Sequence, residues 1–376
     1  MSIDYNQKSA SIIYSCYVDL SKEGSYTEHV FGICEAAKKQ NSDFELWSTA
    51  RSNVKLSNSR NLVDKSWIFC STESNILNYI LFDIIGSLNL IKRRKLKPIF
   101  YVRPTLISLF QLLTARAMGL EVVLEINGVA SEELKVKGKW YYVLVKVVER
   151  IQLRLATRGV CVSEGIRGYY SRITAAKLSV VSNGCRLAEI RSEHRVIAVK
   201  DRMELVFIGS LVPWQGLLEF LKALGGYSNL SRLRIHVFGE GALESNIKLI
   251  SEELGIDLIF YGWIESKEIP NRLEDIDIAL LPRLSHGPSG SPLKLFRYMS
   301  MGFPIITTNA DGIKELEGLD KILLKFDYSE VGSLHNLLDM ILLGEIDLNL
   351  VSKKTLEITR ERFTWDVSYA KIFPKI

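Results

Sequence analysis

The sequence of 376 residues lacks a long apolar run. No stretch of about eighteen residues is apolar and uncharged throughout, so we expect no transmembrane helix. The first residues, MSIDYNQKSAS, show neither the apolar segment nor the cleavage site of a secretory signal peptide. The cysteines at 16, 34, 70, 161 and 185 have neither a CxxC pair nor another metal-ligand spacing. These absences predict a cytoplasmic protein with buried, reduced thiols.

A strong charge of one sign is also absent. The net charge is +5, and the apolar share of 47% and charged share of 24% are typical of soluble globular proteins. No recognised nucleic-acid-binding fold accompanies the basic clusters, so nucleic acid is not an expected partner. The dinucleotide fingerprint GxGxxG is missing, which disfavours a dehydrogenase. The histidines show no ligand spacing, and we expect DID at 275–277 to link a helix to a strand rather than bind a metal.

Apolar strand patterns alternate with amphipathic helix patterns along most of the chain. Residues 11–18 and 122–126 are typical of buried strands, whereas 27–40, 106–119 and 135–158 follow a helical pattern. This alternation predicts parallel sheets with helices between the strands. The other predicted strands are 99–102, 159–163, 177–184 and, in the second half, MELVFIGSL, LRIHVFGEG, DLIFYGW, IDIALLP, FPIITTN and KILLKFD.

The alternating pattern occurs twice, before and after the polar segment 186–202. We therefore predict two doubly wound α/β domains, the first covering 1–198 and the second 199–360. Binding sites are expected at the carboxyl ends of the strands and in a cleft between the domains.

Two loops are typical of anion binding. In YVDLSKEGSYTEH the chain leaves a strand, passes Gly24 and Ser25 and opens a helix, whose first N–H groups favour an anion. An ordinary βα turn is the alternative. In GPSGSPLKLFRYM, Pro292 suits a first helical turn, because its missing N–H is not needed there. Lys294 and Arg297 share a face of that helix, which favours a diphosphate; a solvated basic face is the alternative.

Ten segments, in this order, carry a resemblance to a known family. They are Gly24-Ser25 with His29, YVRP (101–104), EINGVASEE (125–133), CVSEGIR (161–167), VVSNGCR (180–186), IGSLVPWQG (208–216), VFGEGALE (237–244), YGWIESKEIP (261–270), SPLKLFRYMSMGFPIITTN (291–309) and FTW (363–365). Together they resemble the family-4 glycosyltransferases of the GT-B fold over nearly the full chain.

The resemblance implies a transferase that takes a sugar from a nucleotide diphosphate sugar and retains its anomeric configuration. The second domain would hold the donor, a UDP- or GDP-sugar, and the first would present the acceptor. The last helix, within 361–376, would cross back to the first domain. No cofactor or metal is implied. The leaving diphosphate would itself take the acceptor proton, so stabilisation of its charge would be the main catalytic contribution.

The family's functional positions can be matched residue by residue. Gly24 and Ser25 match a loop that meets the diphosphate, and Arg103 and Glu125 are expected at the acceptor. Asn127 matches a position near the reacting sugar. The predicted catalytic residues are Asn127, Lys294 and Arg297. The other predicted donor-binding residues are Ser210, Gln215, Gly262, Trp263, Ile264, His286, Ser289, Gly290, Ser291, Pro292 and Leu293.

The chain departs from the family pattern at four positions. The family's two glutamates match Ser289 and Arg297, and its diphosphate-binding Arg and Lys match Ser210 and Gln215. We hypothesise that the cation lost at 215 is replaced by the one gained at 297, with Lys294 and either Arg283 or Arg103 assisting, since Arg donates bidentate hydrogen bonds to phosphate. The alternative is a catalytically silent GT-B subunit that binds a partner protein or a glycan. Binding of a nucleoside diphosphate would distinguish the two.

Basic residues concentrate in the predicted acceptor half. KRRKLK (92–97) and the stretch 135–158, which mixes Trp140 and two tyrosines with Lys and Arg, suit an anionic membrane surface. A solvated helix face is the alternative. We therefore expect a glycan or lipid-linked acceptor, a role in surface polysaccharide or glycolipid assembly, and a peripheral position on the inner face of the plasma membrane.

Overall fold

The computed structural model describes residues 11–22, 24–40, 42–51, 65–71, 76–105, 108–136, 138–198, 200–265, 268–284, 290–310, 312–314, 316 and 318–374. The chain forms two compact units. The first contains the residues up to Asn183 together with those from Trp365 onward, and the second is Gly184–Thr364. Each unit contains one parallel sheet, as expected for the α/β alternation in the sequence.

The sheet of the first unit has seven parallel strands in the order β3-β2-β1-β4-β5-β6-β7. The strands are β1 Ile12–Asp19, β2 Phe44–Arg51, β3 Lys65–Ser71, β4 Ile99–Arg103, β5 Val122–Ile126, β6 Arg158–Cys161 and β7 Lys177–Val180. The chain order reverses between β1 and β4. Loops that leave neighbouring strands in opposite directions open a crevice at such a point.

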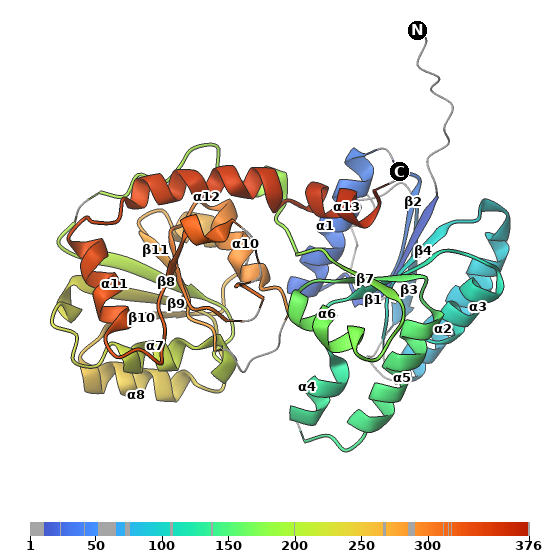
Figure 1. Ribbon diagram of the computed structural model, residues 1–376, viewed down its shortest axis with the longest axis horizontal. Coiled ribbons are helices and arrows are strands. Elements are labelled where there is room, and N and C mark those ends of the chain that lie inside the picture. Colours follow the sequence, from blue (N-terminus) through green and yellow to red (C-terminus); the bar gives the residue numbers. More distant parts are fainter. Residues whose placement is uncertain are drawn as a thin grey trace, which may run out of the picture. The chain divides into compact units, whose positions relative to one another are not determined.

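Helices cover both faces of this sheet (Figure 1). They are α1 Ser25–Lys39, α2 Ile76–Lys92, α3 Phe110–Ala117, α4 Ala130–Val136, α5 Tyr142–Leu155, α6 Glu164–Ser171 and α13 Trp365–Ile372, with 3-10 turn η1 Arg94–Leu96. Side chains of α2, α3, α5 and α6 pack into the same apolar core as Phe100 and Leu124. On the opposite face, α13 packs against α1 and Phe373 contacts the ring of Tyr101.

A buried carboxylate ties α2 to α3. The Asp83 side chain accepts hydrogen bonds from the backbone N–H groups of Leu109, Phe110 and Gln111, at 2.9, 2.7 and 3.1 Å. These donors belong to the first turn of α3, where intrahelical acceptors are lacking. Burial raises the pKa of Asp83, although the three donors act in the opposite direction. Asp83 therefore caps a neighbouring helix and has a structural role.

The second unit has a six-stranded parallel sheet in the order β10-β9-β8-β11-β12-β13. Its strands are β8 Met203–Ile208, β9 Leu233–Phe238, β10 Asp257–Gly262, β11 Ile278–Leu281, β12 Ile305–Thr307 and β13 Leu323–Lys325. Its helices are α7 Leu217–Ala223, α8 Glu244–Leu254, α9 Ile269–Arg272, α10 Leu293–Ser300, α11 Ser333–Leu342 and α12 Leu348–Arg362, with 3-10 turns η2 Leu187–Glu189, η3 Pro213–Gln215, η4 Leu230–Arg232 and η5 Leu319–Lys321. The apolar side chains of α7, α8 and α11 pack on one face of this sheet, and those of α9 and α10 pack on the other.

The first unit ends at Asn183, fifteen residues before the predicted boundary at 198. Residues 184–198 belong to the second unit, and the side chain of Arg195 is buried in it. Its guanidinium donates to the carbonyl oxygens of Leu273, Glu274 and Ile276 and lies 4.0 Å from the centre of the Phe303 ring. Burial lowers the pKa of Arg195 to about 10. A segment that is polar in sequence is therefore partly buried.

The helical pattern predicted over 135–158 is two helices. The chain leaves α4 at Val136 and enters α5 at Tyr142, and Gly138 between them has a φ of 66°. This left-handed conformation is accessible to glycine at little cost and interrupts a helix. The cysteines at 16, 34, 161 and 185 are free and buried, as predicted, whereas the side chain of Cys70 lies outside the described residues.

Candidate functional site

In the second unit, close backbone contacts form where the strand order reverses, at the carboxyl ends of β8 and β11. Gly216 has a φ of 76°, and a Cβ placed there would lie 1.7 Å from the carbonyl oxygen of Pro282. The backbone N–H of Leu284 donates to the carbonyl of Trp214 at 3.2 Å. The loops after the two strands are therefore held against each other at the position where doubly wound sheets bind ligands.

Lys294, in the first turn of α10, extends over these loops. Its ammonium lies 3.9 Å from the centre of the Phe207 ring and donates to Gln215 Oε1 at 3.0 Å. A Cβ on Gly209 would lie 2.6 Å from Lys294 Nζ, so an alanine there would displace the ammonium. The structure thus brings two predicted residues, Lys294 and Gln215, into direct contact.

The ammonium of Lys294 titrates near neutral pH. Burial is the main cause and the charge of Arg283 is the second; together they lower the pKa of Lys294 to about 7. Arg283 follows β11 and is itself buried, with 7% of its surface exposed. An anion bound beside two cationic groups would favour the protonated lysine. This pair is therefore suited to hold a negatively charged group such as a diphosphate.

The start of α10 is fixed to the central strand of the sheet. Ile208 donates its backbone N–H to Tyr298 Oη at 2.8 Å, and the Tyr298 side chain is fully buried. Pro292 is the N-cap, and the helix begins at Leu293. The preceding Ser291 is buried, and Gly290 is partly buried. The first backbone N–H groups of the anchored helix lack intrahelical acceptors, and such groups at a helix start are typical of anion binding.

The structure describes most of the other predicted donor residues. Arg297 is partly buried and lies one turn beyond Lys294 on α10, and Ser210 is exposed in the turn after β8. The predicted His286 and Ser289 lie outside the described residues. The contribution of these four residues to donor binding stays a prediction.

The predicted donor-binding residues Gly262, Trp263 and Ile264 lie at the end of β10 and directly after it. Gly262, with a φ of 68°, accepts a hydrogen bond from the backbone N–H of Gly239 at 2.8 Å. The next residue, Trp263, donates its N–H to Glu240 Oε1 at 3.3 Å and exposes 63% of its surface. Ile264 packs against the apolar core. An exposed indole beside a strand end is available to stack on a planar ligand.

In the first unit, a buried carboxylate lies at the carboxyl end of β5. Glu125 Oε1 is 3.0 Å from His29 Nε2 and 3.8 Å from Arg103 Nη1, and it accepts a hydrogen bond from Asn127 Nδ2. His29 Nδ1 lies 3.0 Å from Asn183 Oδ1. The predicted residues Arg103, Glu125 and Asn127 are therefore gathered in one cluster, and the structure adds His29 and Asn183 to it.

Opposing effects act on the Glu125 carboxyl. Burial alone would raise its pKa, but His29 and Arg103 hold the pKa below its usual range. The charged carboxylate in turn raises the pKa of the buried Tyr14 and Tyr101, for which burial is the larger cause. Glu125 is therefore an anion at neutral pH and attracts the Arg103 guanidinium.

The predicted loop before α1 is described in part. Gly24 is exposed, and its carbonyl oxygen accepts a hydrogen bond from Thr27 Oγ1 at 2.8 Å. The backbone of Ser25 begins α1, but its side chain lies outside the described residues. The following Tyr26 exposes 66% of its surface and packs with its ring 4.9 Å from the Arg103 guanidinium carbon.

A cavity of about 1060 Å³ lies in the first unit beside this cluster. Arg103, Glu125 and Asn127 line part of it, and aromatic and aliphatic side chains of α1, α2 and α5 line much of the rest. The cavity therefore lies at the carboxyl ends of β4 and β5. It is beside the reversal of strand order between β1 and β4, where the topology predicts a ligand site.

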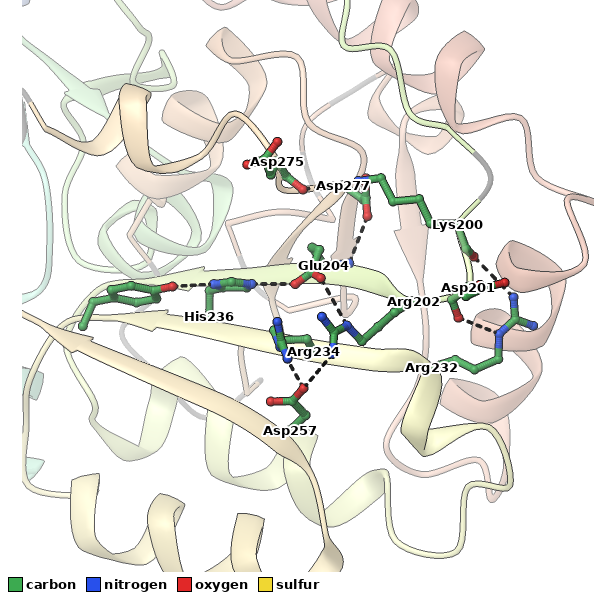
Figure 2. A network of polar contacts seen from close by, with 11 residues as sticks. Lys200, Asp201, Arg202, Glu204, Arg232, Arg234, His236, Asp257, Asp275 and Asp277 are labelled. Carbon is green, nitrogen blue, oxygen red and sulfur yellow. Dashed lines mark hydrogen bonds and ion pairs between the residues drawn. The ribbon is translucent and has the colours of Figure 1, made fainter.

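The acidic pair at 275–277 belongs to a structural network (Figure 2). Asp277 accepts hydrogen bonds from Lys200 Nζ and from the backbone N–H of Glu204, both at 2.9 Å. In the same network, Asp257 lies between Arg202 and Arg234. Within the described ranges, no three His, Cys, Asp or Glu side chains gather closely enough to hold a metal ion.

Comparison with known proteins agrees with this geometry. Residues 202–333, which contain the Lys294 site, match the family described as "Glycosyl transferases group 1". This part of the chain is therefore similar to a group 1 glycosyl transferase domain. The putative colanic acid biosynthesis glycosyltransferase WcaL of Escherichia coli K12 is 26% identical over 136 residues, which cover 35% of this chain and 34% of WcaL.

Solved glycosyltransferase structures share the fold of the whole chain. The lipopolysaccharide outer core galactosyltransferase WaaB aligns over 97% of this chain and 100% of its own, with a TM-score of 0.67 and 15% identity. HepE of Anabaena, solved in complex with UDP, aligns over 96% of this chain and 98% of its own, with a TM-score of 0.71 and 14% identity. The chain has the GT-B fold.

The matches with curated sequences are shorter. The alignments span 53%, 34% and 65% of the length of three curated relatives. The comparisons thus identify the fold of this chain and the domain that residues 202–333 resemble. They do not identify its reaction or its substrates.

Some members of the site were not predicted. Arg283 and Phe207 define the surroundings of Lys294; Arg283 was proposed as an assisting cation, whereas no motif marks Phe207 as a ligand-binding residue. His29 was part of the family resemblance but had no assigned role. The useful signal for Arg283 was its place directly after the strand IALLP, at a carboxyl end of the second sheet.

Proposed function

We propose that this chain is a retaining glycosyltransferase that moves a sugar from a UDP- or GDP-sugar to a glycan or lipid-linked acceptor in surface polysaccharide or glycolipid assembly. The observation that carries the proposal is that two cationic side chains, Lys294 and Arg283, act on each other electrostatically where the order of the second sheet reverses. Their charges and the start of α10 supply what a nucleotide diphosphate needs: cations and backbone N–H donors.

The reaction follows from this placement. The bond between the anomeric carbon and the diphosphate oxygen breaks, and negative charge develops on that oxygen. Protonated Lys294 stabilises the charge, assisted by Arg297 in place of the family's lysine. The acceptor hydroxyl attacks from the face that the diphosphate leaves, and its proton passes to a diphosphate oxygen. Attack on that face retains the anomeric configuration, and electrostatic stabilisation supplies the main rate enhancement.

The first unit would present the acceptor in this scheme. Glu125 and Arg103 line its cavity with charged groups, and Asn127 stands at the end of β5. We propose that Arg103 and Glu125 orient the acceptor and that Asn127 contacts the reacting sugar. No metal takes part in the proposed steps, because the positive charge at the leaving group comes from Lys294, Arg297 and Arg283.

We also propose a peripheral position on an anionic membrane. Within the described residues, no helix combines the length and the apolarity that a membrane span requires. Around 92–97, Lys92, Arg94, Lys95 and Lys97 are exposed, whereas Arg93 is paired with Glu45 at 2.5 Å. On 135–158, exposed Trp140, Val143 and Val147 stand beside exposed Arg150 and Arg154. Apolar side chains flanked by cations suit a bilayer surface.

Titration calorimetry with UDP and with GDP tests the central claim. We expect binding of one of the two at micromolar concentration, at least tenfold weaker in Lys294→Gln and also weaker in Arg297→Ala. Lys222→Gln is the matched control, since Lys222 lies on a helix of the same unit and pairs only with Glu219 at the surface. If neither nucleotide binds the intact chain, the silent subunit becomes the better account.

A further inference from the structure

The cavity of the first unit has an apolar wall that a sugar does not need. Its volume of about 1060 Å³ reaches the upper end of the usual range for ligand pockets. Five side chains of the α5 segment line it, namely Tyr141, Leu144, Val145, Val148 and Leu153. The first four, from Tyr141 to Val148, follow one helix face and form a stripe about 10 Å long at 1.5 Å per residue.

The polar groups of this wall are already satisfied within the protein. The buried Glu149 carboxylate accepts hydrogen bonds from the backbone N–H and the Oγ of Ser131, at 3.0 and 2.7 Å. Gln152 Nε2 donates to the carbonyl oxygen of Thr105 at 2.7 Å. These contacts turn the polar atoms of α5 toward its neighbours, so the helix offers the cavity mainly an apolar surface.

The apolar lining continues to the protein surface. Ile76 at the start of α2 and Leu144 on α5 both line the cavity, and they expose 68% and 59% of their surfaces. Neighbouring side chains on the same helices, Leu77 and Val147, are also exposed. Because the rim of the cavity is apolar, a hydrocarbon chain can enter the cavity without crossing a ring of polar side chains.

One end of the cavity carries a cation. The Arg103 side chain is 14% exposed, and its Nη1 is 3.8 Å from Glu125 and has no hydrogen-bond partner among the described residues. Glu125 is also engaged by His29 and Asn127 at shorter range. A guanidinium presents several donors in one plane and binds phosphate oxygens well.

We infer that the cavity binds an acceptor made of a long apolar chain with a phosphate head. The chain lies along the stripe of α5 and the head lies at Arg103, at the carboxyl ends of β4 and β5. The inference rests on the proposed function and narrows its acceptor to a lipid phosphate, whose P–OH group is the attacking hydroxyl.

The test uses farnesyl phosphate as the probe, titrated into the full chain and followed by calorimetry. Farnesol and inorganic phosphate supply the chain and the head separately, and each is expected to bind at least tenfold more weakly than the probe. Val148→Trp fills the cavity and is expected to weaken probe binding at least tenfold. Val147→Trp is the matched control, because Val147 is its neighbour on α5, is 49% exposed and does not line the cavity.

Arg103→Gln tests the contribution of the phosphate head to binding separately from that of the apolar chain. The variant is expected to lose most of the preference for farnesyl phosphate over farnesol, and Arg103→Lys to recover part of it. Wild-type affinity in Val148→Trp, or equal losses in Val147→Trp and Val148→Trp, would overturn the inference, since either result places the chain outside the cavity. Full competition by UDP would overturn it as well, since it would place the probe in the nucleotide site.

UDP and GDP titrations on the same preparations keep the two proposals apart. Nucleotide binding without farnesyl phosphate binding would refute the lipid acceptor and leave the transferase standing. Absence of both would refute the two together. Unchanged nucleotide binding in Val148→Trp, together with an unchanged far-UV circular dichroism spectrum, shows that this variant is folded.

Discussion

The near-neutral pKa of Lys294 predicts that nucleotide binding depends on pH. In the free protein, burial and Arg283 hold this pKa at about 7, so the side chain loses its proton as the pH rises above that value. A bound diphosphate favours the ammonium and raises the pKa. Above pH 7, binding must therefore take up a proton, and affinity must fall as the pH rises.

The size of the effect follows from this linkage. If the pKa in the complex lies above 9, the dissociation constant of UDP or GDP rises about tenfold per pH unit between pH 7.5 and 9, or about 1.4 kcal/mol per unit. Proton uptake approaches about one per nucleotide at pH 8.5. Below pH 6 the lysine is already charged before binding, so it contributes no further change of the dissociation constant with pH. The terminal phosphate of the nucleotide, with a pKa of about 6, is largely ionised over the upper range.

Calorimetry in two buffers of different ionisation enthalpy measures the affinity and the proton uptake together. Lys294→Gln should bind weakly with no uptake, and its affinity should meet that of the wild type near pH 9. Lys294→Arg is the charged control, because arginine keeps its proton throughout this range. An affinity that stays constant from pH 6.5 to 9 with no proton uptake would refute the link between Lys294 and the diphosphate.

Three further predictions concern the same framework. Gly209→Ala should weaken nucleotide binding at least tenfold by calorimetry, because the new Cβ would lie 2.6 Å from Lys294 Nζ; Gly168→Ala, with open space around it, is the control and should bind normally. Asp83→Ala should lower the free energy of unfolding by about 1–3 kcal/mol in urea titrations, since three backbone N–H groups lose their buried acceptor; an unchanged midpoint would contradict the capping role. Sugar transfer, once a donor is identified, should keep its rate in excess EDTA, and a loss restored by Mg²⁺ would contradict the metal-free scheme.

The sequence predicted strands best where they are uniformly apolar. The predicted strand 122–126 is β5 to the residue, and the second half of the chain contains each strand that was expected there. Strands β2 and β3 and helix α2 were not predicted. In β2, Ser48 and Thr49 are buried next to apolar residues, and Ser48 Oγ donates to the carbonyl of Val18. Only a neighbouring strand supplies that acceptor, so the local pattern looked too polar for a buried strand.

The residues of the site also divide into those that the local sequence pattern predicts and those that only the fold brings together. The pattern of α10 and its preceding loop is local, so Pro292, Lys294 and Arg297 could be predicted as a helix start with cations on one face. The acceptor residues Arg103, Glu125 and Asn127 were predicted from the family resemblance. Their bonds to one another and to His29 depend on two strands and a helix that meet only in the folded unit.

The sequence by itself determined the class of the fold, the order of most strands and the position of the helix start with its lysine. Each depends on residues close together in the chain, whose spacing dictates local structure. Tertiary structure alone decided the chemistry of Lys294. Its low pKa needs the ring of Phe207, the narrow backbone at Gly209 and the charge of Arg283, all brought to one point by the sheet. Charge and burial act through space, and the distance along the chain does not reveal them.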